Sequence, residues 1–96
     1  MAEKKIKGPK KLERHFKGVA NHRRIQILLL IAKQPEISLI NIADTISGNM
    51  KTVSEHVRRL TLAGLVEKRY AGREVRHVLT PYGRTFYSFI QTFSRS

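Results

Sequence analysis

The chain has 96 residues, the size of one small domain, and its 19 Lys and Arg residues outnumber seven Asp and Glu residues, giving a formal net charge of +12. A domain this basic concentrates on polyanions, of which nucleic acid is the most common, although a merely soluble cationic surface is the simpler alternative. The sequence lacks cysteine, which excludes disulfides and thiolate metal sites, and its most apolar run, residues 25–32, is too short to span a bilayer.

Residues 1–11 form a segment with five lysines, a Gly-Pro break and few side chains to bury. We predict a flexible basic arm here, followed by one folded domain over residues 12–96. Two interpretations of the arm remain open: it lies along DNA phosphates, or it is a solvated tail.

Two helices are predicted at the start of the domain. A short amphipathic helix is expected over residues 12–19, because Leu12, Phe16 and Val19 recur at helical spacing. Asn21 is a favourable N-cap for a second helix over residues 22–33, which ends before Pro35. This second helix should be largely buried, since its inward stripe of Ile25, Leu28, Leu29 and Ala32 is widened by Ile27, Leu30 and Ile31.

A pair of shorter helices follows. Ser38 is a suitable N-cap for a third helix over residues 39–46, and Asn49 for a fourth helix over residues 50–63. The connection, residues 47–49, is a tight turn that contains glycine. Two short helices joined in this way form the pattern of a helix-turn-helix.

The hydrophobic period then changes to two. Residues 66–70 and 75–80 flank a glycine-bearing turn at 71–74, which predicts a β-hairpin. Pro81, preceded by Thr80 as a cap, begins a last helix rich in aromatic residues. The predicted order is α-α-α-α-β-β-α. This is a mainly α fold with a small β-hairpin wing, a winged helix-turn-helix.

Three stretches carry a family resemblance: ANHRRIQIL at 20–28, ISLINIADTI at 37–46, and KTVSEHVRRLTLAGLVEKRYAGREVRHVLTP at 51–81. Together they resemble the ArsR-type family of bacterial and archaeal regulators, from about residue 18 to residue 81. The resemblance implies a dimeric transcriptional regulator that binds double-stranded DNA. We expect a repressor located in the cytoplasm and associated with the prokaryotic nucleoid.

The sequence departs from the metal-sensing members of that family. Cysteine is absent, residues 81–96 contain no His, Asp or Glu, and no two histidines have the i,i+4 spacing of a helical metal site. We therefore expect no metal and no other cofactor. We also expect no enzyme, because the chain has a single aspartate and neither a Ser-His-Asp grouping nor a phosphate-cradling glycine loop.

The fourth helix is the expected recognition helix in the major groove, with Val53, Val57 and Leu60 facing inward. Glu55 has two open interpretations: it accepts a hydrogen bond from cytosine, or it pairs with a neighbouring arginine. The complete set of expected DNA contacts on this helix is Asn49, Lys51, Thr52, Ser54, Glu55, Arg58 and Arg59.

The wing, residues 66–80, is expected to position the protein on DNA. Arg73 at the turn and Arg76 beside it are expected to contact the flanking backbone or an adjacent minor groove. His56 and His77 are expected to be structural: the family's matching histidine hydrogen-bonds within the fold, and His77 fills an inward wing position.

The terminal helices carry more apolar side chains than one small core uses. By resemblance to the family, the first and last helices are expected to form a homodimer interface. Its predicted residues are Leu12, Phe16, Phe86, Phe89, Ile90 and Phe93. Two other functions remain open: a sequence-indifferent, basic DNA-coating protein of the same fold, and a winged helix that contacts protein or RNA within a larger assembly.

Overall fold

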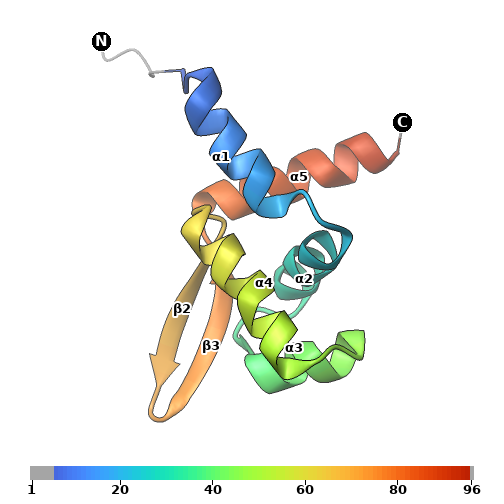
Figure 1. Ribbon diagram of the computed structural model, residues 1–96, viewed down its shortest axis with the longest axis vertical. Coiled ribbons are helices and arrows are strands. Elements are labelled where there is room, and N and C mark those ends of the chain that lie inside the picture. Colours follow the sequence, from blue (N-terminus) through green and yellow to red (C-terminus); the bar gives the residue numbers. More distant parts are fainter. Residues whose placement is uncertain (1–5, 96) are drawn as a thin grey trace.

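The computed structural model describes residues 6–95, so the first five residues of the predicted basic arm lie outside the described part of the chain. Five helices and three strands follow one another in the order α1, α2, β1, α3, α4, β2, β3 and α5 (Figure 1). The helices are α1 Pro9–Val19, α2 His22–Lys33, α3 Leu39–Ile46, α4 Met50–Leu62 and α5 Pro81–Ser94. The strands are β1 Ile37–Ser38, β2 Val66–Ala71 and β3 Glu74–Leu79. The predicted winged helix-turn-helix fold is confirmed.

The helix starts follow from local capping chemistry. Asn21 accepts hydrogen bonds from the amides of Arg23 and Arg24, and the Ser38 hydroxyl accepts one from the amide of Asn41. The Thr80 hydroxyl accepts one from the amide of Gly83, directly beyond Pro81 in the first turn of α5. Each side chain satisfies an amide that lacks a partner within its own helix.

Two element predictions need correction. Helix α1 begins at Pro9 instead of residue 12, because proline at the first helical position needs no amide partner and its fixed φ suits a helix. This turn belongs to the segment that was predicted as a flexible arm. Strand β1 was also missed, since two residues show no periodicity; it is recognised only through its pairing with β3.

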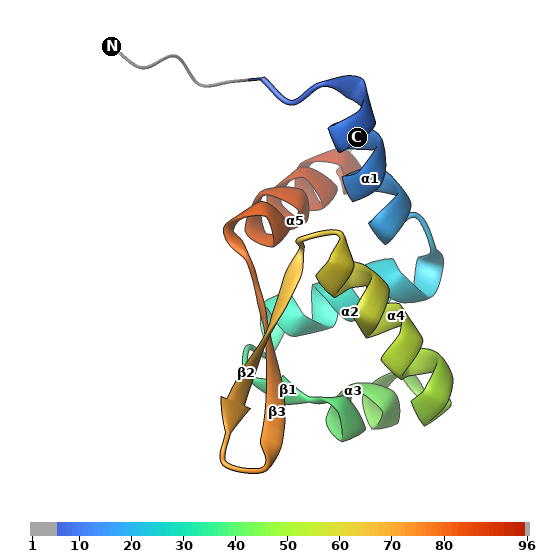
Figure 2. The same cartoon turned by 60° about the vertical axis from the view of Figure 1, so that its left-hand side comes forward.

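The three strands form one antiparallel sheet in the order β1-β3-β2. Ile37 pairs with His77, and Val66 pairs with Leu79 at the base of the hairpin. Figures 1 and 2 show α1 and α5 together at one end of the molecule, with the hairpin tip at the other end. The wing therefore projects away from the terminal helices.

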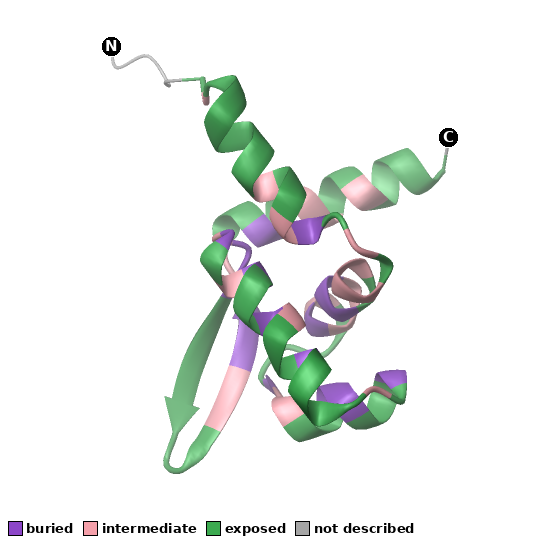
Figure 3. Cartoon of the chain, viewed as in Figure 1, coloured by how far each residue is buried: buried purple, intermediate pink, exposed green. Residues whose placement is uncertain are grey.

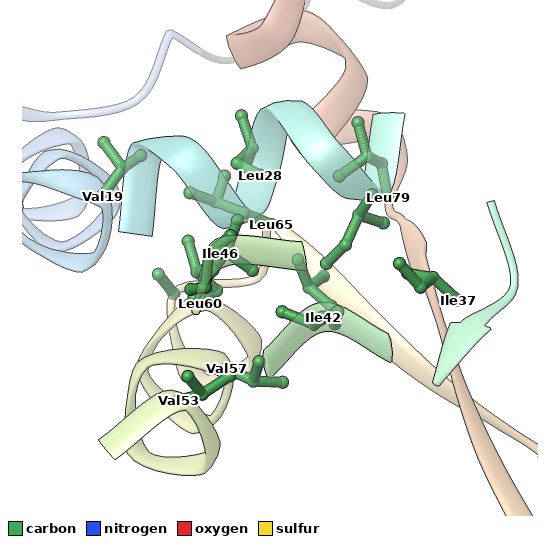
Figure 4. Close-up of a cluster of buried hydrophobic side chains, with 14 of the residues drawn as sticks. Val19, Leu28, Ile37, Ile42, Ile46, Val53, Val57, Leu60, Leu65 and Leu79 are labelled. Carbon is green, nitrogen blue, oxygen red and sulfur yellow. The ribbon is translucent and has the colours of Figure 1, made fainter. Parts of the chain in front are cut away.

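The hydrophobic core of the described residues lies between α2, α3, α4 and the base of the sheet. Leu28, Ile42, Leu60 and Leu65 come from four different segments and are fully buried together (Figure 4). On α2, the buried residues are Ile27, Leu28 and Ile31, whereas the predicted stripe was centred on Ile25, Leu28, Leu29 and Ala32. Helix α2 packs against α4, β3 and α5, and Ile25, Leu29 and Ala32 lie half-buried at the margin of this contact.

Candidate nucleic-acid interface

Helix α4 has one buried face and one exposed face. Val53, Val57 and Leu60 are buried in the core, as predicted. Exposed residues follow the opposite side and the flanks of the helix (Figure 3). They are Lys51, Thr52, Ser54, Glu55, Arg58 and Arg59. The polar and cationic groups that were predicted for DNA contact are therefore all accessible on the helix surface.

Asn49 fixes the first turn of α4. Its side-chain oxygen accepts hydrogen bonds from the amides of Lys51 and Thr52, at 2.9 and 3.2 Å. The partial positive charge at a helix N-terminus favours nearby anions, so this end of α4 suits a phosphate-rich partner. The structure thus gives the Asn49 oxygen a capping role beside its predicted role in DNA contact.

Glu55 forms a cluster of ion pairs on the exposed side of α4. Its carboxylate accepts hydrogen bonds from Nε and Nη2 of Arg58 at 2.9 and 2.7 Å, and from Nε of Arg59 at 3.0 Å. The hydrogen bonds from Arg58 and then Arg59 lower the pKa of Glu55 to about 2. Of the two interpretations, the pairing with arginine is the one observed, and the cytosine contact stays a prediction. Exposed pairs of this kind add little stability, so their main effect is to orient both guanidinium groups.

Two arginines at the start of α2, which the sequence did not single out, border the helix-turn-helix. Arg23 Nη1 donates to the carbonyl of Ile46 at 2.8 Å and so satisfies the end of α3. Arg24 Nη1 lies 3.4 Å from Nδ1 of His56. Burial, and next the charges of Arg24 and Arg23, lower the pKa of His56, so its neutral form accepts from Arg24. The prediction that His56 bonds within the fold is confirmed.

The wing is a hairpin with a two-residue tip. Gly72 has a φ of 65° and Arg73 follows it, which fits a type II′ turn. The Arg73 side chain is exposed at the tip. Arg76 is half-buried, and its Nε lies 3.2 Å from Oε1 of Glu74. The wing therefore separates its two predicted arginines, with one at the tip and one paired along the strand.

His77 lies on the opposite face of β3 from Arg76 and is only 2% exposed. Its Nδ1 lies 2.9 Å from the carbonyl of Ile37, across the β1–β3 pairing. Burial lowers the pKa of His77, which favours the neutral imidazole. The prediction of a satisfied core histidine is confirmed, and its partner is the strand that the sequence did not reveal.

The apolar surface of the terminal helices consists of the six residues predicted for a dimer. Leu12, Phe16, Phe89 and Phe93 are exposed, whereas Phe86 and Ile90 are half-buried and pack against the core. The rings of Phe16 and Phe86 meet edge to face at 5.3 Å between centroids, and those of Phe89 and Phe93 stack at 5.7 Å. A groove of about 240 Å³ lies between the helices, lined by Leu12, Phe16, Thr85, Phe86 and Phe89. This surface is apolar and open.

Helix α1 also touches the end of α4. His15 Nδ1 lies 2.7 Å from the carbonyl of Ala63, the C-cap residue directly after α4. Gly18 approaches Ala63 so closely that a Cβ at Gly18 would lie 2.2 Å from the Cβ of Ala63. The position of α1 is therefore tied directly to the position of the candidate recognition helix.

Within residues 6–95, no three His, Cys, Asp or Glu side chains are grouped to hold a metal ion. No helix in the described part of the chain is long and apolar enough to cross a membrane.

Comparisons with known proteins bear on this arrangement. A family model described as HVO_A0114 matches residues 19–85. A solution structure of the domain of Mb0332 from Mycobacterium bovis is 30% identical, with a TM-score of 0.81, and the match covers 90% of this chain and 80% of that chain. It is described as a homodimeric winged helix-turn-helix DNA-binding domain and a possible ArsR-family transcriptional regulator.

Two further structures share the fold. The transcriptional regulator HlyU from Vibrio vulnificus is 25% identical over 88% of both chains, with a TM-score of 0.74. FabT from Streptococcus pneumoniae, solved in complex with DNA, is 16% identical over 88% of this chain and 65% of that chain, with a TM-score of 0.71. No curated protein sequence matches the chain.

Proposed function

The chain belongs to the HVO_A0114 family and is an ArsR-type winged helix-turn-helix protein, and from this premise we propose that it is a homodimeric regulator that binds specific double-stranded DNA sequences and represses transcription. The observation that carries this proposal is the surface of α4. A capped helix presents Lys51, Thr52 and Ser54 to solvent near its N-terminus, while its other face is buried in the core. This arrangement suits insertion into a major groove, whose width admits a helix.

Each exposed group has a chemistry that base edges recognise. Lys51 is able to donate to guanine O6 or N7, and the Thr52 methyl group suits contact with the methyl of thymine. Arg73 is exposed at the wing tip, which suits contact with the flanking backbone or an adjacent minor groove. In this proposal, helix α4 reads sequence and the wing fixes the position of the protein on the duplex.

A dimer completes the proposed mechanism. The open apolar surface of α1 and α5 matches the helices that we expect to pair, and the description of the Mb0332 domain as homodimeric supports this. Two-fold symmetry would place two recognition helices about 34 Å apart, one turn of the double helix. The preferred DNA site would then be an inverted repeat, and the protein would be associated with the nucleoid. FabT in complex with DNA is a precedent for DNA binding by this fold.

The experiment is selection of bound sequences from a random pool of duplex DNA, followed by titration of the protein onto the selected site. We expect an enriched inverted repeat, and on that site a footprint that saturates at one dimer.

The net charge of +12 favours one other candidate, a DNA-coating protein that binds without sequence preference. Equal affinity for the selected site and for shuffled DNA, with graded titration and no footprint, would establish the coating function. Failure to bind any duplex at low salt would reject both functions and leave protein or RNA contacts.

A further inference from the structure

A small basic notch lies where α1 meets the C-terminal end of α4. The notch has a volume of about 220 Å³ and is lined by Arg14, Lys17, Gly18, Arg59, Leu62 and Ala63. Three of these six residues are cationic and none is acidic. Within residues 6–95 Arg14 forms no ion pair, Lys17 pairs with Glu13 at 3.3 Å, and Arg59 pairs with Glu55. Both pairs are solvent-exposed, so a phosphate would compete with the carboxylates at little cost.

The notch continues the face of α4 that is proposed to enter DNA. Lys51, Glu55 and Arg59 are spaced by four residues and share one side of the helix. Arg59 lies about 12 Å further along the helix axis than Lys51, from a rise of about 1.5 Å per residue. The major groove is about 8.5 Å deep, so a group about 12 Å from its floor lies at its edge when α4 enters with its N-terminus first. If Lys51 reaches the floor of the groove, then Arg59 and the notch lie at its edge, where the phosphates are.

Helix α1 is held at this place by close packing. Gly18 permits direct contact with Ala63, and His15 bonds the same residue. Leu12 and Phe16, which belong to the surface proposed for the dimer, lie on the other side of α1 from Arg14 and Lys17. Helix α1 itself therefore lies between the recognition helix and the proposed dimer surface, with its cations at the notch.

From this geometry we propose that the basic face of α1 is a third DNA-contacting surface, in which Arg14 and Lys17 join Arg59 to bind backbone phosphates between the two half-sites. The partner is the phosphate backbone of the duplex that α4 reads, so the inference rests on the proposed function. The contacts carry no direct sequence information, but they fix the register of α4 relative to the centre of the operator.

The test compares two double variants that each remove two positive charges. Arg14→Ala/Lys17→Ala removes two of the three cations that line the notch. Lys33→Ala/Arg95→Ala removes two cations from a separate surface between the ends of α2 and α5. Dimers of the 96-residue chain are titrated onto the selected site across a salt series, and phosphate ethylation interference maps the contacts. Circular dichroism melting verifies that each variant is folded.

We expect the affinity of Arg14→Ala/Lys17→Ala at 0.15 M salt to fall about fivefold for each phosphate that it no longer binds, and the salt slope to decrease by about 0.9 for each. Interference at phosphates between the half-sites should disappear, while interference within the half-sites persists. Glu13→Gln, which frees Lys17, should bind the operator more tightly than the wild type. The charge-conserving Arg14→Lys/Lys17→Arg variant should retain the interference pattern.

The result that overturns the inference is a notch variant that behaves like Lys33→Ala/Arg95→Ala and keeps the wild-type interference between the half-sites. In that case the wild type still binds its selected site, and the proposed function stands. A wild-type protein that selects no DNA sequence rejects the proposed function and this inference together.

Discussion

The proposed dimer depends on exposed aromatic side chains of α5, and Phe89→Glu tests it most directly. Phe89 is 50% exposed in the single chain. A phenylalanine has roughly 200 Å² to bury, so about 100 Å² of Phe89 would be covered in a dimer. At about 25 cal/mol per Å², this coverage contributes about 2.5 kcal/mol in each subunit. A two-fold dimer contains this Phe89 contact twice. Removing both copies should therefore raise the dissociation constant of the dimer by roughly a thousandfold or more.

Sedimentation velocity over a protein concentration series of about 1–100 μM measures this change. The wild type should sediment as a dimer, and Phe89→Glu as a monomer with an unchanged circular dichroism spectrum. Tyr70→Glu on strand β2 is the matched control, because Tyr70 is also aromatic and is 77% exposed. Phe86 is less suitable, since it is half-buried against the core and its replacement would also remove core packing. A Phe89→Glu protein that dimerises as tightly as Tyr70→Glu would refute the reasoning.

Three other predictions concern α4, the wing and β3. Lys51→Ala should weaken binding to the selected site by about 1–3 kcal/mol and reduce discrimination between base sequences there. Arg73→Ala should weaken binding to selected and shuffled DNA alike. Equal losses for both variants in parallel titrations on the two DNAs would reject specific readout. Asn49→Ala should destabilise the fold by about 1 kcal/mol, because two amides of α4 lose their hydrogen-bond acceptor. Thermal unfolding should then show a drop in Tm of about 4–8 °C. An unchanged Tm would rule out the cap as a stabilising contact. Burial lowers the pKa of His77 in the folded state, so the unfolded state binds more protons below about pH 6.5, and the free energy of unfolding should fall as pH decreases from that value. In urea titrations at several pH values His77→Tyr should lose part of this dependence, and an identical dependence in the variant would show that other groups cause it.

Local chemistry made most of the fold predictable. Helix starts follow from single side chains such as Asn21, Ser38, Asn49 and Thr80, because a cap acts within three residues of itself. The inward face of α4 follows from the spacing of its apolar residues. The wing follows from the change of period to two around a glycine-bearing turn, and the family resemblance agrees with the resulting order of elements.

Contacts between distant residues were not predictable from the sequence. The pairing of Ile37 with His77 defines β1, and nothing near residue 37 indicates it. Arg23 bonds the end of α3, although its charge alone suggests only a solvated or DNA-binding group. The candidate site shows the same limit: the sequence predicted which side chains α4 exposes and offered the local pairing of Glu55 with arginine, but it did not predict that α1 places cations beside Arg59.

The wing tip has a consequence for how this scaffold diversifies. A Cβ at Gly72 would meet no atom within 4 Å, so the tip is surrounded by open space, and only its left-handed φ restricts the residue there. Residues inserted between Gly72 and Arg73 would lengthen the hairpin without disturbing any buried side chain. The length of the wing is thus separable from the folding of the domain. In the proposed DNA complex, a longer or shorter wing would cover more or less of the duplex, while the proposed recognition helix and the core stay the same.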